Sequence, residues 1–237
     1  MKRGFSLLES LLSLFVFLLI ILFSLEGYSQ ARRHFFKLKE DETSNISAFA
    51  ALDRMRKDLL DAGFGLIEPM RLGLLEAVTV KDGHLIILSL SEELGLRESL
   101  VEGQQRVMVQ ATAHVKKGHK VCVHDSEKGE VTWISQVGKG EIVFASPLRY
   151  AYQEDDVHML LLREIVVYHD RTKESLRRKV NASPAQPLLE DAKSFRAEYF
   201  DSENLARISF RLNRKPEEEY GITVFAKNPA LEAIQKH

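Results

Sequence analysis

The sequence lacks most features of a disulfide-stapled, zinc-binding or nucleic-acid-binding protein. Its 237 residues include a single cysteine, Cys122, which excludes an internal disulfide and a cysteine-rich zinc module. Lysine and arginine number 33 against 34 aspartate and glutamate, so the basic surplus of a nucleic-acid binder is missing. The 6 prolines and 13 glycines are too few for long disordered or collagen-like stretches. We therefore expect a fold held by its apolar core, with no direct nucleic-acid partner.

What the sequence does contain is one long apolar run near the N-terminus. Every residue in the range 14–23 is apolar, and Glu9 is the only charged residue between Arg3 and Glu26. As an α-helix, residues 5–25 would span roughly 31 Å at about 1.5 Å per residue, which matches a hydrocarbon core of about 30 Å. The run is a membrane span or a targeting signal.

Two ordinary explanations fit this run only in part. A cleaved secretory signal needs a small-residue exit, and the exit at 23–28 offers no alanine. An uncleaved signal anchor fits the length, with Lys2 and Arg3 held in the cytoplasm. The anchor leaves Glu9 unexplained, because a carboxylate inside a membrane helix costs roughly 2.5 to 3.5 kcal/mol on insertion scales and needs a partner.

The segment 2–9, KRGFSLLE, resembles the class III leader of type IV pilins and type II secretion pseudopilins. The resemblance implies that a prepilin peptidase cuts between Gly4 and Phe5 and that Phe5 becomes N-methylated. Lys2 and Arg3 would supply the leader charge. A glycine before the cut has a physical reason as well, because a residue without Cβ lets the backbone enter a tight protease cleft.

The same resemblance implies an assembly role for Glu9, which lies one helical turn beyond Phe5. In a filament of this family the carboxylate pairs with the N-terminal amine of a neighbouring subunit. Both ions are costly in an apolar core, and pairing removes most of that cost. A simpler alternative is a first-turn carboxylate stabilised by the helix dipole.

Beyond the apolar run the helix is expected to continue as a stalk. Gly27 is the only glycine between Gly4 and Gly63, and no proline precedes Pro69. We expect the helix to end near Gly63, since glycine suits the left-handed conformation that follows a helix C-terminus. An amphipathic stripe at spacings of three and four predicts the face that packs on a head domain: Ile46, Phe49, Leu52, Met55 and Leu59.

After residue 66 the pattern changes to short alternating runs that are typical of strands. A polar stretch at 92–102 predicts a short helix, the prolines of 181–187 predict a surface loop, and the tail 228–237 is expected to be loosely attached. The strands are predicted at 74–80, 85–90, 106–115, 120–124, 131–137, 142–145, 164–169, 175–180, 194–200, 205–212 and 221–225.

The head extends the resemblance. Residues 51–65 resemble the stalk-to-head junction of PilW-type minor pilins, and the segments 186–200 and 205–212 resemble their closing hairpin and the strand after it. J-type pseudopilins of type II secretion share much of this C-terminal pattern. The implied fold is α+β and pilin-like, a long N-terminal membrane-spanning helix packed on a mainly antiparallel β head. The expected divisions are 1–4 (leader), 5–25 (membrane or filament-core helix), 26–65 (extracytoplasmic stalk) and 66–237 (head).

Catalytic signals are missing from the sequence. It contains no Gly-x-Ser-x-Gly motif and no phosphate-binding glycine loop, so we expect no enzyme activity. His114, His119 and His124 recur every five residues, which on a strand places neighbours on opposite faces and disfavours a metal triad. Cys122 alternates with valines and is expected to face a core.

No cofactor is expected, with calcium as a weak exception. Calcium prefers oxygen ligands, and Glu154, Asp155 and Asp156 form an acidic run. The resemblance to J-type pseudopilins adds to this idea, since calcium is reported in that family. The run lacks a spaced loop pattern, which favours an ordinary solvated turn.

The sequence therefore predicts a minor pilin that is cleaved, N-methylated and then helps to initiate or support pilus assembly. We expect a single-pass protein of the bacterial inner membrane with an extracytoplasmic head, later found in a pilus or pseudopilus. Its partners would be the prepilin peptidase, other minor pilins and the major pilin (or pseudopilins), and the inner-membrane assembly platform. Alternatives are a J-like type II secretion pseudopilin and a signal-anchored extracytoplasmic binding protein or enzyme.

Overall fold

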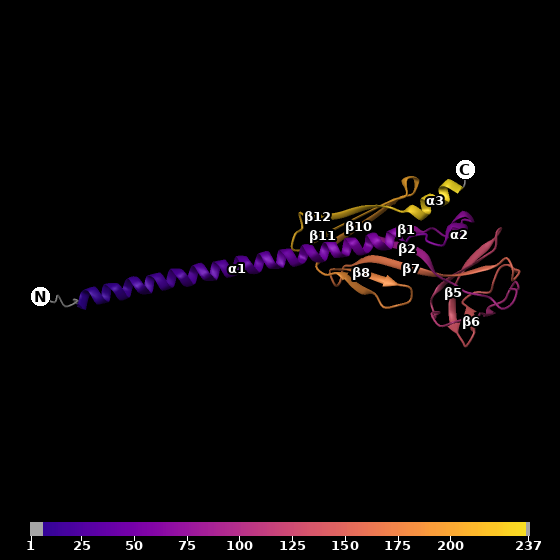
Figure 1. Ribbon diagram of the computed structural model, residues 1–237, viewed down its shortest axis with the longest axis horizontal. Coiled ribbons are helices and arrows are strands. Elements are labelled where there is room, and N and C mark those ends of the chain that lie inside the picture. The colour runs from indigo at the N-terminus through magenta and orange to yellow at the C-terminus, as the bar shows by residue number, and fades with distance from the viewer. Residues whose placement is uncertain (1–6, 236–237) are drawn as a thin grey trace. The chain divides into compact units, whose positions relative to one another are not determined.

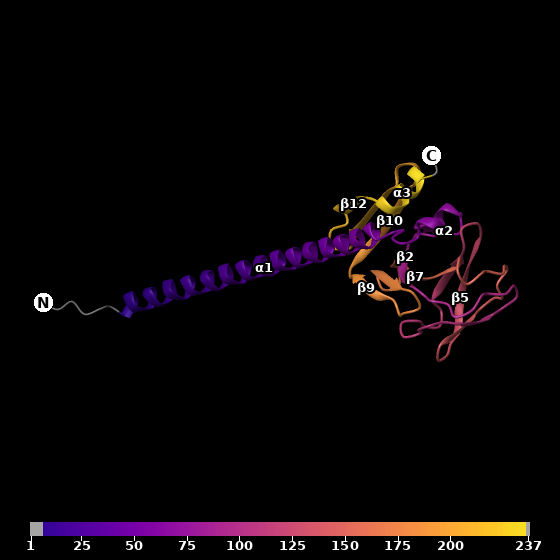
Figure 2. The same ribbon diagram turned by 45° about the vertical axis from the view of Figure 1, so that its right-hand side comes forward.

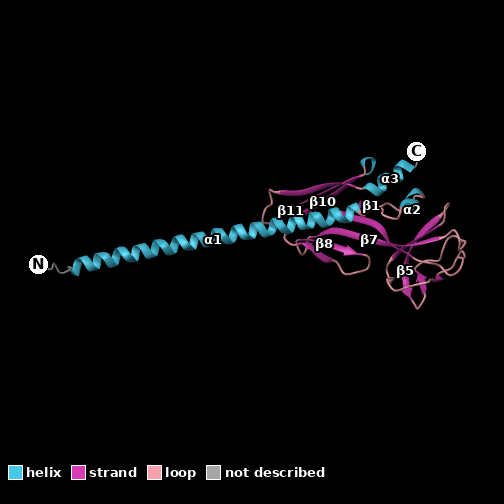
Figure 3. Ribbon diagram, in the orientation of Figure 1, coloured by secondary structure: helices cyan, strands magenta, loops and turns pink. Residues whose placement is uncertain are grey.

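The computed structural model describes residues 7–235 of the chain. The chain divides into two compact units, Met1–Ala48 and Phe49–His237. The elements of the described residues are α1 (Leu7–Leu60), α2 (Ile67–Arg71), β1 (Val78–Lys81), β2 (His84–Glu93), β3 (Arg106–Met108), β4 (Lys120–His124), β5 (Gly129–Val137), β6 (Glu141–Phe144), β7 (His158–Asp170), β8 (Ser175–Val180), β9 (Gln186–Leu189), β10 (Ala192–Phe200), a 3₁₀ turn (Asp201–Glu203), β11 (Leu205–Leu212), β12 (Glu219–Phe225) and α3 (Lys227–Gln235). The predicted α+β layout, one long apolar N-terminal helix followed by a mainly antiparallel β head, is confirmed (Figure 3).

Helix α1 runs for 54 residues without interruption. Gly27 does not break it, and nothing lies within 4 Å of a Cβ built at that position. The helix ends three residues before Gly63, which has φ +70° and whose amide donates to the Leu88 carbonyl at 2.8 Å. At Gly65, also at φ +70°, a Cβ would come within 2.6 Å of the Leu90 side chain. The glycines therefore end the helix as predicted and let the chain pass close against β2.

Among the described residues the strands form a nine-stranded sheet and a three-stranded sheet. Seven strands of the larger sheet follow the order β1-β2-β7-β4-β5-β6-β3, and β8 joins β7 with β9 beyond it. All pairings in both sheets are antiparallel. Strand β7 is the central strand of the larger sheet. One of its edges pairs with β2, and the other pairs first with β4 and then, further along, with β8.

The last turns of α1 lie inside the head. Figures 1 and 2 place the sheet β10-β11-β12 on one side of these turns and strands β7 and β8 on the other. Leu52, Met55 and Leu59 are buried there, as the stripe predicted. The prediction is wrong for the first two residues of the stripe, because Ile46 and Phe49 are 62% and 63% exposed. The buried face instead uses Ala51 and Asp58, because small and ion-paired residues fit between two sheets that approach the helix closely.

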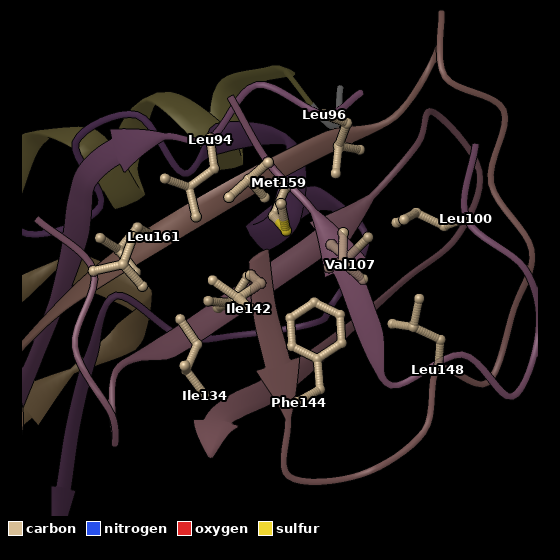
Figure 4. Close-up of a cluster of buried hydrophobic side chains, with 14 of the residues drawn as sticks. Leu94, Leu96, Leu100, Val107, Ile134, Ile142, Phe144, Leu148, Met159 and Leu161 are labelled. Atoms are coloured by element: carbon tan, nitrogen blue, oxygen red, sulfur yellow. The ribbon is translucent and has the colours of Figure 1, made fainter. Parts of the chain in front are cut away.

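A second apolar core lies within the part of the head between β2 and β7. Its side chains come from β3 to β6, from the start of β7 and from the loops between them (Figure 4). The largest fully buried members are Phe144, Tyr152, Leu100, Ile134, Ile142 and Met159.

Two local predictions for the head are wrong. Residues 92–102 form no helix: β2 continues to Glu93, and the chain stays extended because Leu94, Leu96 and Leu100 all enter the second core. The surface loop predicted at 181–187 ends early, because its last two residues belong to strand β9. Pro187 pairs there with Arg177 at the sheet edge. Its missing N–H is tolerated there because an edge strand needs partners on one side only.

The tail is also more ordered than predicted. Residues 227–235 form α3, and Asn228 is buried, donating from Nδ2 to the Ala62 carbonyl at 2.8 Å. This bond satisfies a carbonyl just beyond the end of α1 and attaches the tail to the helix–head junction.

Candidate functional site

The candidate site begins with the apolar segment of α1. From Leu11 to Phe23 every residue of the segment is exposed, with Phe15 at 59% and Leu22 at 61%. A helix that is apolar all round is stable only when protein or lipid covers it. In the described part of the chain this is the one helix long and apolar enough to cross a membrane, with a mean hydropathy of 2.3 in its most apolar window and none of that window buried.

The hydroxyl of Ser24, directly after this segment, is satisfied by the helix itself. Ser24 donates from its hydroxyl to the Ile20 carbonyl at 2.7 Å, one turn back along the helix. Such back-bonding satisfies a hydroxyl where no water is present. The helix can therefore enter an apolar environment while this hydroxyl keeps a hydrogen-bond partner.

The predicted processing and assembly residues are only partly covered by the structure. Glu9 lies in the first described turn of α1 and is exposed. Lys2, Arg3, Gly4 and Phe5 lie outside the described residues. Cleavage, methylation and the role of Glu9 stay predictions.

The helix–head junction contains an ion pair that sequence reasoning missed. Asp58 on α1 accepts two hydrogen bonds from Arg178 on β8, at 2.6 Å from Nε and 2.9 Å from Nη2. The Asp58 side chain is 3% exposed and that of Arg178 is 12% exposed. Arg54 adds a third charge, with its Nε 3.8 Å from Asp58. A bidentate pair of this kind fixes both the position and the rotation of the helix against the sheet.

A signal for Asp58 does exist in the sequence. Ala51, Met55, Asp58 and Ala62 recur at spacings of four, three and four, so the carboxylate falls on the buried face. A carboxylate in such a position needs a cation, and nothing local points to Arg178, which is 120 residues away.

A polar hollow of about 420 Å³ opens where β7 and β11 end and β10 begins. Its polar groups are committed to the fold: Glu174 accepts from Asn213 Nδ2 at 3.1 Å, and His169 Nε2 lies 2.8 Å from the Ala192 carbonyl. Both groups are thus occupied by contacts within the head. Its remaining charged lining comes from Arg171 and Lys193.

The three histidines that recur every five residues lie in different environments. His114 is exposed in a turn, whereas His119 and His124 are buried. Burial, and then the charge of Lys116, lower the pKa of His119, which keeps the ring neutral and able to accept from the Lys116 amide at 3.4 Å. Within the described residues no group of three or more His, Cys, Asp or Glu is arranged to hold a metal ion.

The other two candidates occupy different environments. Glu154, Asp155 and Asp156 lie in an exposed turn, where the Glu154 amide donates to Ser99 Oγ at 3.2 Å. A calcium site at this turn stays a prediction. Cys122 is fully buried on β4, as expected, and burial raises the pKa of its thiol to about 12. Such a thiol is not a nucleophile at neutral pH.

The comparisons with known proteins yield little. No model of a known protein family matches the chain, and no curated protein matches it. Among solved structures, the Gp54 tailspike of Acinetobacter baumannii bacteriophage AP22, in complex with A. baumannii capsular saccharide, is similar over 32% of this chain and 15% of the tailspike chain. The identity is 15% and the TM-score is 0.29, a likeness that carries no argument about fold or function.

Proposed function

We propose that this chain is a minor pilin, a filament subunit that helps to initiate or support type IV pilus assembly. One combination of features carries the proposal. A leader with Lys2, Arg3 and Gly4 stands directly before an apolar segment, and that segment is exposed from Leu11 to Phe23 and belongs to a helix that runs unbroken to Leu60. An exposed apolar surface of this extent marks a membrane or protein interaction site.

The physical logic of assembly follows from the apolar segment. Before assembly the segment lies in the inner membrane, with Lys2 and Arg3 in the cytoplasm and the head outside it. In the filament the same side chains are covered by helices of other subunits. This transfer exchanges one apolar environment for another, so packing and polar pairs set the register of the helices.

Glu9 provides such a polar pair. Cleavage after Gly4 creates a new amine at Phe5, and a carboxylate one turn along the helix of a neighbouring subunit can neutralise it. Each ion alone is costly in an apolar core, so the pair favours the assembled state over partly docked ones. The partners are then the prepilin peptidase, the major and other minor pilins, and the assembly platform of the inner membrane.

The first test is mass spectrometry of the mature N-terminus in membranes of cells with a prepilin peptidase. We expect methylated Phe5 as the first residue. Gly4→Val should abolish cleavage because a side chain is placed in the peptidase cleft. Gly27→Val is the control, since space around Gly27 is open. An intact Met1 in the wild-type chain would support the signal-anchor alternative and defeat the proposal.

The second test separates processing from assembly. Glu9→Ala should be cleaved normally and be absent from purified filaments, whereas Glu26→Ala at the other end of the apolar run should be incorporated. Normal incorporation of Glu9→Ala would refute the pairing role. Finding the wild-type chain as the dominant subunit along the filament would refute the assignment as a minor component.

A type II secretion pseudopilin is the second candidate, favoured by the likeness of 205–212 to J-type pseudopilins. Both candidates predict the same processing, so the discriminating readout is the phenotype of a deletion. Loss of surface pili with secretion intact supports the minor pilin. Loss of secreted enzymes with pili intact supports the pseudopilin.

A further inference from the structure

Two histidines meet across neighbouring strands at one end of the large sheet. His124 ends β4 and His158 begins β7, and the two residues are direct partners in the antiparallel register. Their rings are stacked with centroids 5.4 Å apart and an interplanar angle of 26°. His124 is 4% exposed, whereas the side chain of His158 is 55% exposed, so the pair lies at the surface with one ring beneath it.

Each ring is held through Nδ1 by an oxygen acceptor. His124 Nδ1 lies 3.1 Å from the Asp125 carbonyl oxygen, which can only accept, so this nitrogen carries the proton. His158 Nδ1 lies 2.6 Å from Glu93 Oε1 and donates to it in the same way. In the neutral form of both rings the proton is thus on Nδ1 and the lone pair is on Nε2.

This arrangement is the one that prepares histidines as metal ligands. Ligating histidines usually donate the second ring N–H to a carbonyl or carboxylate, which fixes the tautomer and raises the basicity of the ligating nitrogen. Within the described residues neither Nε2 of the pair has a hydrogen-bond partner. In the stacked arrangement the two Nε2 atoms do not yet face one ion. The side chains of His158 and Glu93 are 55% and 54% exposed, so they can move together and bring the His158 Nε2 toward that of His124 while keeping their hydrogen bond.

We propose that His124 and His158 form a binding site for a divalent late transition-metal ion, with Cu²⁺ bound most tightly. Imidazole nitrogen suits Cu²⁺, Ni²⁺ and Zn²⁺, and affinity at such ligands rises to a maximum at Cu²⁺. Two protein ligands leave the remaining positions to water, so the site is exchangeable and unlike a closed structural zinc site. Calcium and magnesium, which need oxygen ligands, are excluded from it.

His84 provides a matched control within the same sheet. Its Nδ1 lies 3.0 Å from the Asp82 carbonyl oxygen, so its Nε2 is prepared in the same way. Its ring neighbour, however, is Tyr168, with centroids 5.2 Å apart. His84 therefore tests whether one prepared imidazole is sufficient, or whether the second histidine is needed.

The test is a calorimetric titration of the full chain in detergent micelles with Cu²⁺, in a buffer with glycine as a competing ligand. We expect one Cu²⁺ per chain, with couplings to two imidazole nitrogens in its electron paramagnetic resonance spectrum. Ca²⁺ should neither bind at the pair nor compete. Glu93→Ala should weaken Cu²⁺ binding about tenfold by releasing the His158 ring. Glu93→Gln, which keeps an acceptor, should weaken it less.

The ligand variants decide the outcome. His158→Ala should weaken binding more than Glu93→Ala and leave a single nitrogen coupling, whereas His84→Ala should bind as the wild type does. His158 is exposed, so this variant should fold; circular dichroism checks it, and the buried His124→Ala is only a supporting variant. Unchanged affinity and spectrum in His158→Ala would overturn the proposal, as would an equal loss in His84→Ala.

Discussion

Leucines in the two parts of α1 have opposite environments although they belong to one helix. Leu14, Leu18 and Leu22 are 55%, 54% and 61% exposed, whereas Leu52 and Leu59 are 6% and 0% exposed. Intrinsic helix propensity is the same for all five, so it does not distinguish the two parts. The difference lies in the partner: the second part has two sheets of its own chain around it, whereas none of the described residues covers the first part, which is stable only when protein or lipid does so.

The largest effect is expected where the second part of the helix is fixed to the sheet. Asp58→Ala leaves Arg178 buried without its counter-ion and should lower the free energy of unfolding by about 3–5 kcal/mol. The measurement is urea unfolding of the full chain in detergent, followed by fluorescence of the single tryptophan, Trp133. Replacing both partners with leucine should restore much of the loss.

Asp53 is the control for this experiment. It pairs with Lys57 at 2.8 Å on the exposed face of the same helix. Asp53→Ala should change the unfolding midpoint far less than Asp58→Ala, because exposed pairs are screened by solvent. Equal effects of the two substitutions would mean that the buried pair does not hold the helix in the head.

The same substitution at two leucines tests the comparison directly. Leu59→Ala should lower the free energy of unfolding by about 2–5 kcal/mol, because it opens a cavity between the sheets. Leu22→Ala should leave head unfolding unchanged. Both variants are measured by the same urea titration, and a comparable loss at Leu22 would show that the apolar segment has a partner within its own chain.

A charge placed in the apolar segment should impair membrane insertion and leave the stability of the head unchanged. Leu18→Arg should reduce membrane insertion by about 2.5–3.5 kcal/mol, since arginine near the centre of a span is costly. Fractionation should then show less of the chain in the membrane, while urea unfolding of the head stays as in the wild type. Unchanged membrane association would contradict the assignment of this segment as the span.

The smallest effect concerns the thiol of the head. Burial raises the pKa of Cys122 from an ordinary value of 9.0 to about 12, so the folded state holds the proton more tightly than the unfolded state. The resulting stabilisation is complete below pH 9 and is lost as the pH rises toward 12. Cys122 should resist alkylation at pH 8 in the folded chain and react once urea unfolds it. Rapid alkylation without urea would show that this strand opens readily.

Prediction from sequence succeeded where the determining contacts are local. The bounds of β4, β8 and β11 match the observed ones, because alternation and flanking turns are encoded within each strand. The start of β7 was missed since Met159 to Leu162 are buried on both faces and show no alternation. The helix expected at 92–102 failed because a distant core, not local polarity, determines that segment.

In the candidate site, too, only the features that depend on consecutive residues could be predicted from the sequence. The apolar span is a property of consecutive residues and could be recognised from them. The Asp58–Arg178 pair joins residues 120 positions apart, and the His124–His158 pair depends on the register of β4 against β7. Contacts of this kind are products of the topology, which short patterns do not specify.

The contact between Glu93 and His158 has a consequence for how this head could evolve. These residues mark where the chain leaves β2 and where it returns at β7, and they touch at 2.6 Å. The intervening residues supply most of the second core, to which β7 adds Met159 and Leu161, and the two ends of this segment lie side by side. Closing such a loop costs entropy that grows only with the logarithm of its length. The segment between Glu93 and His158 can therefore change in length without a large entropic cost. The packing of the last turns of α1 between β7, β8 and the three-stranded sheet does not depend on that length.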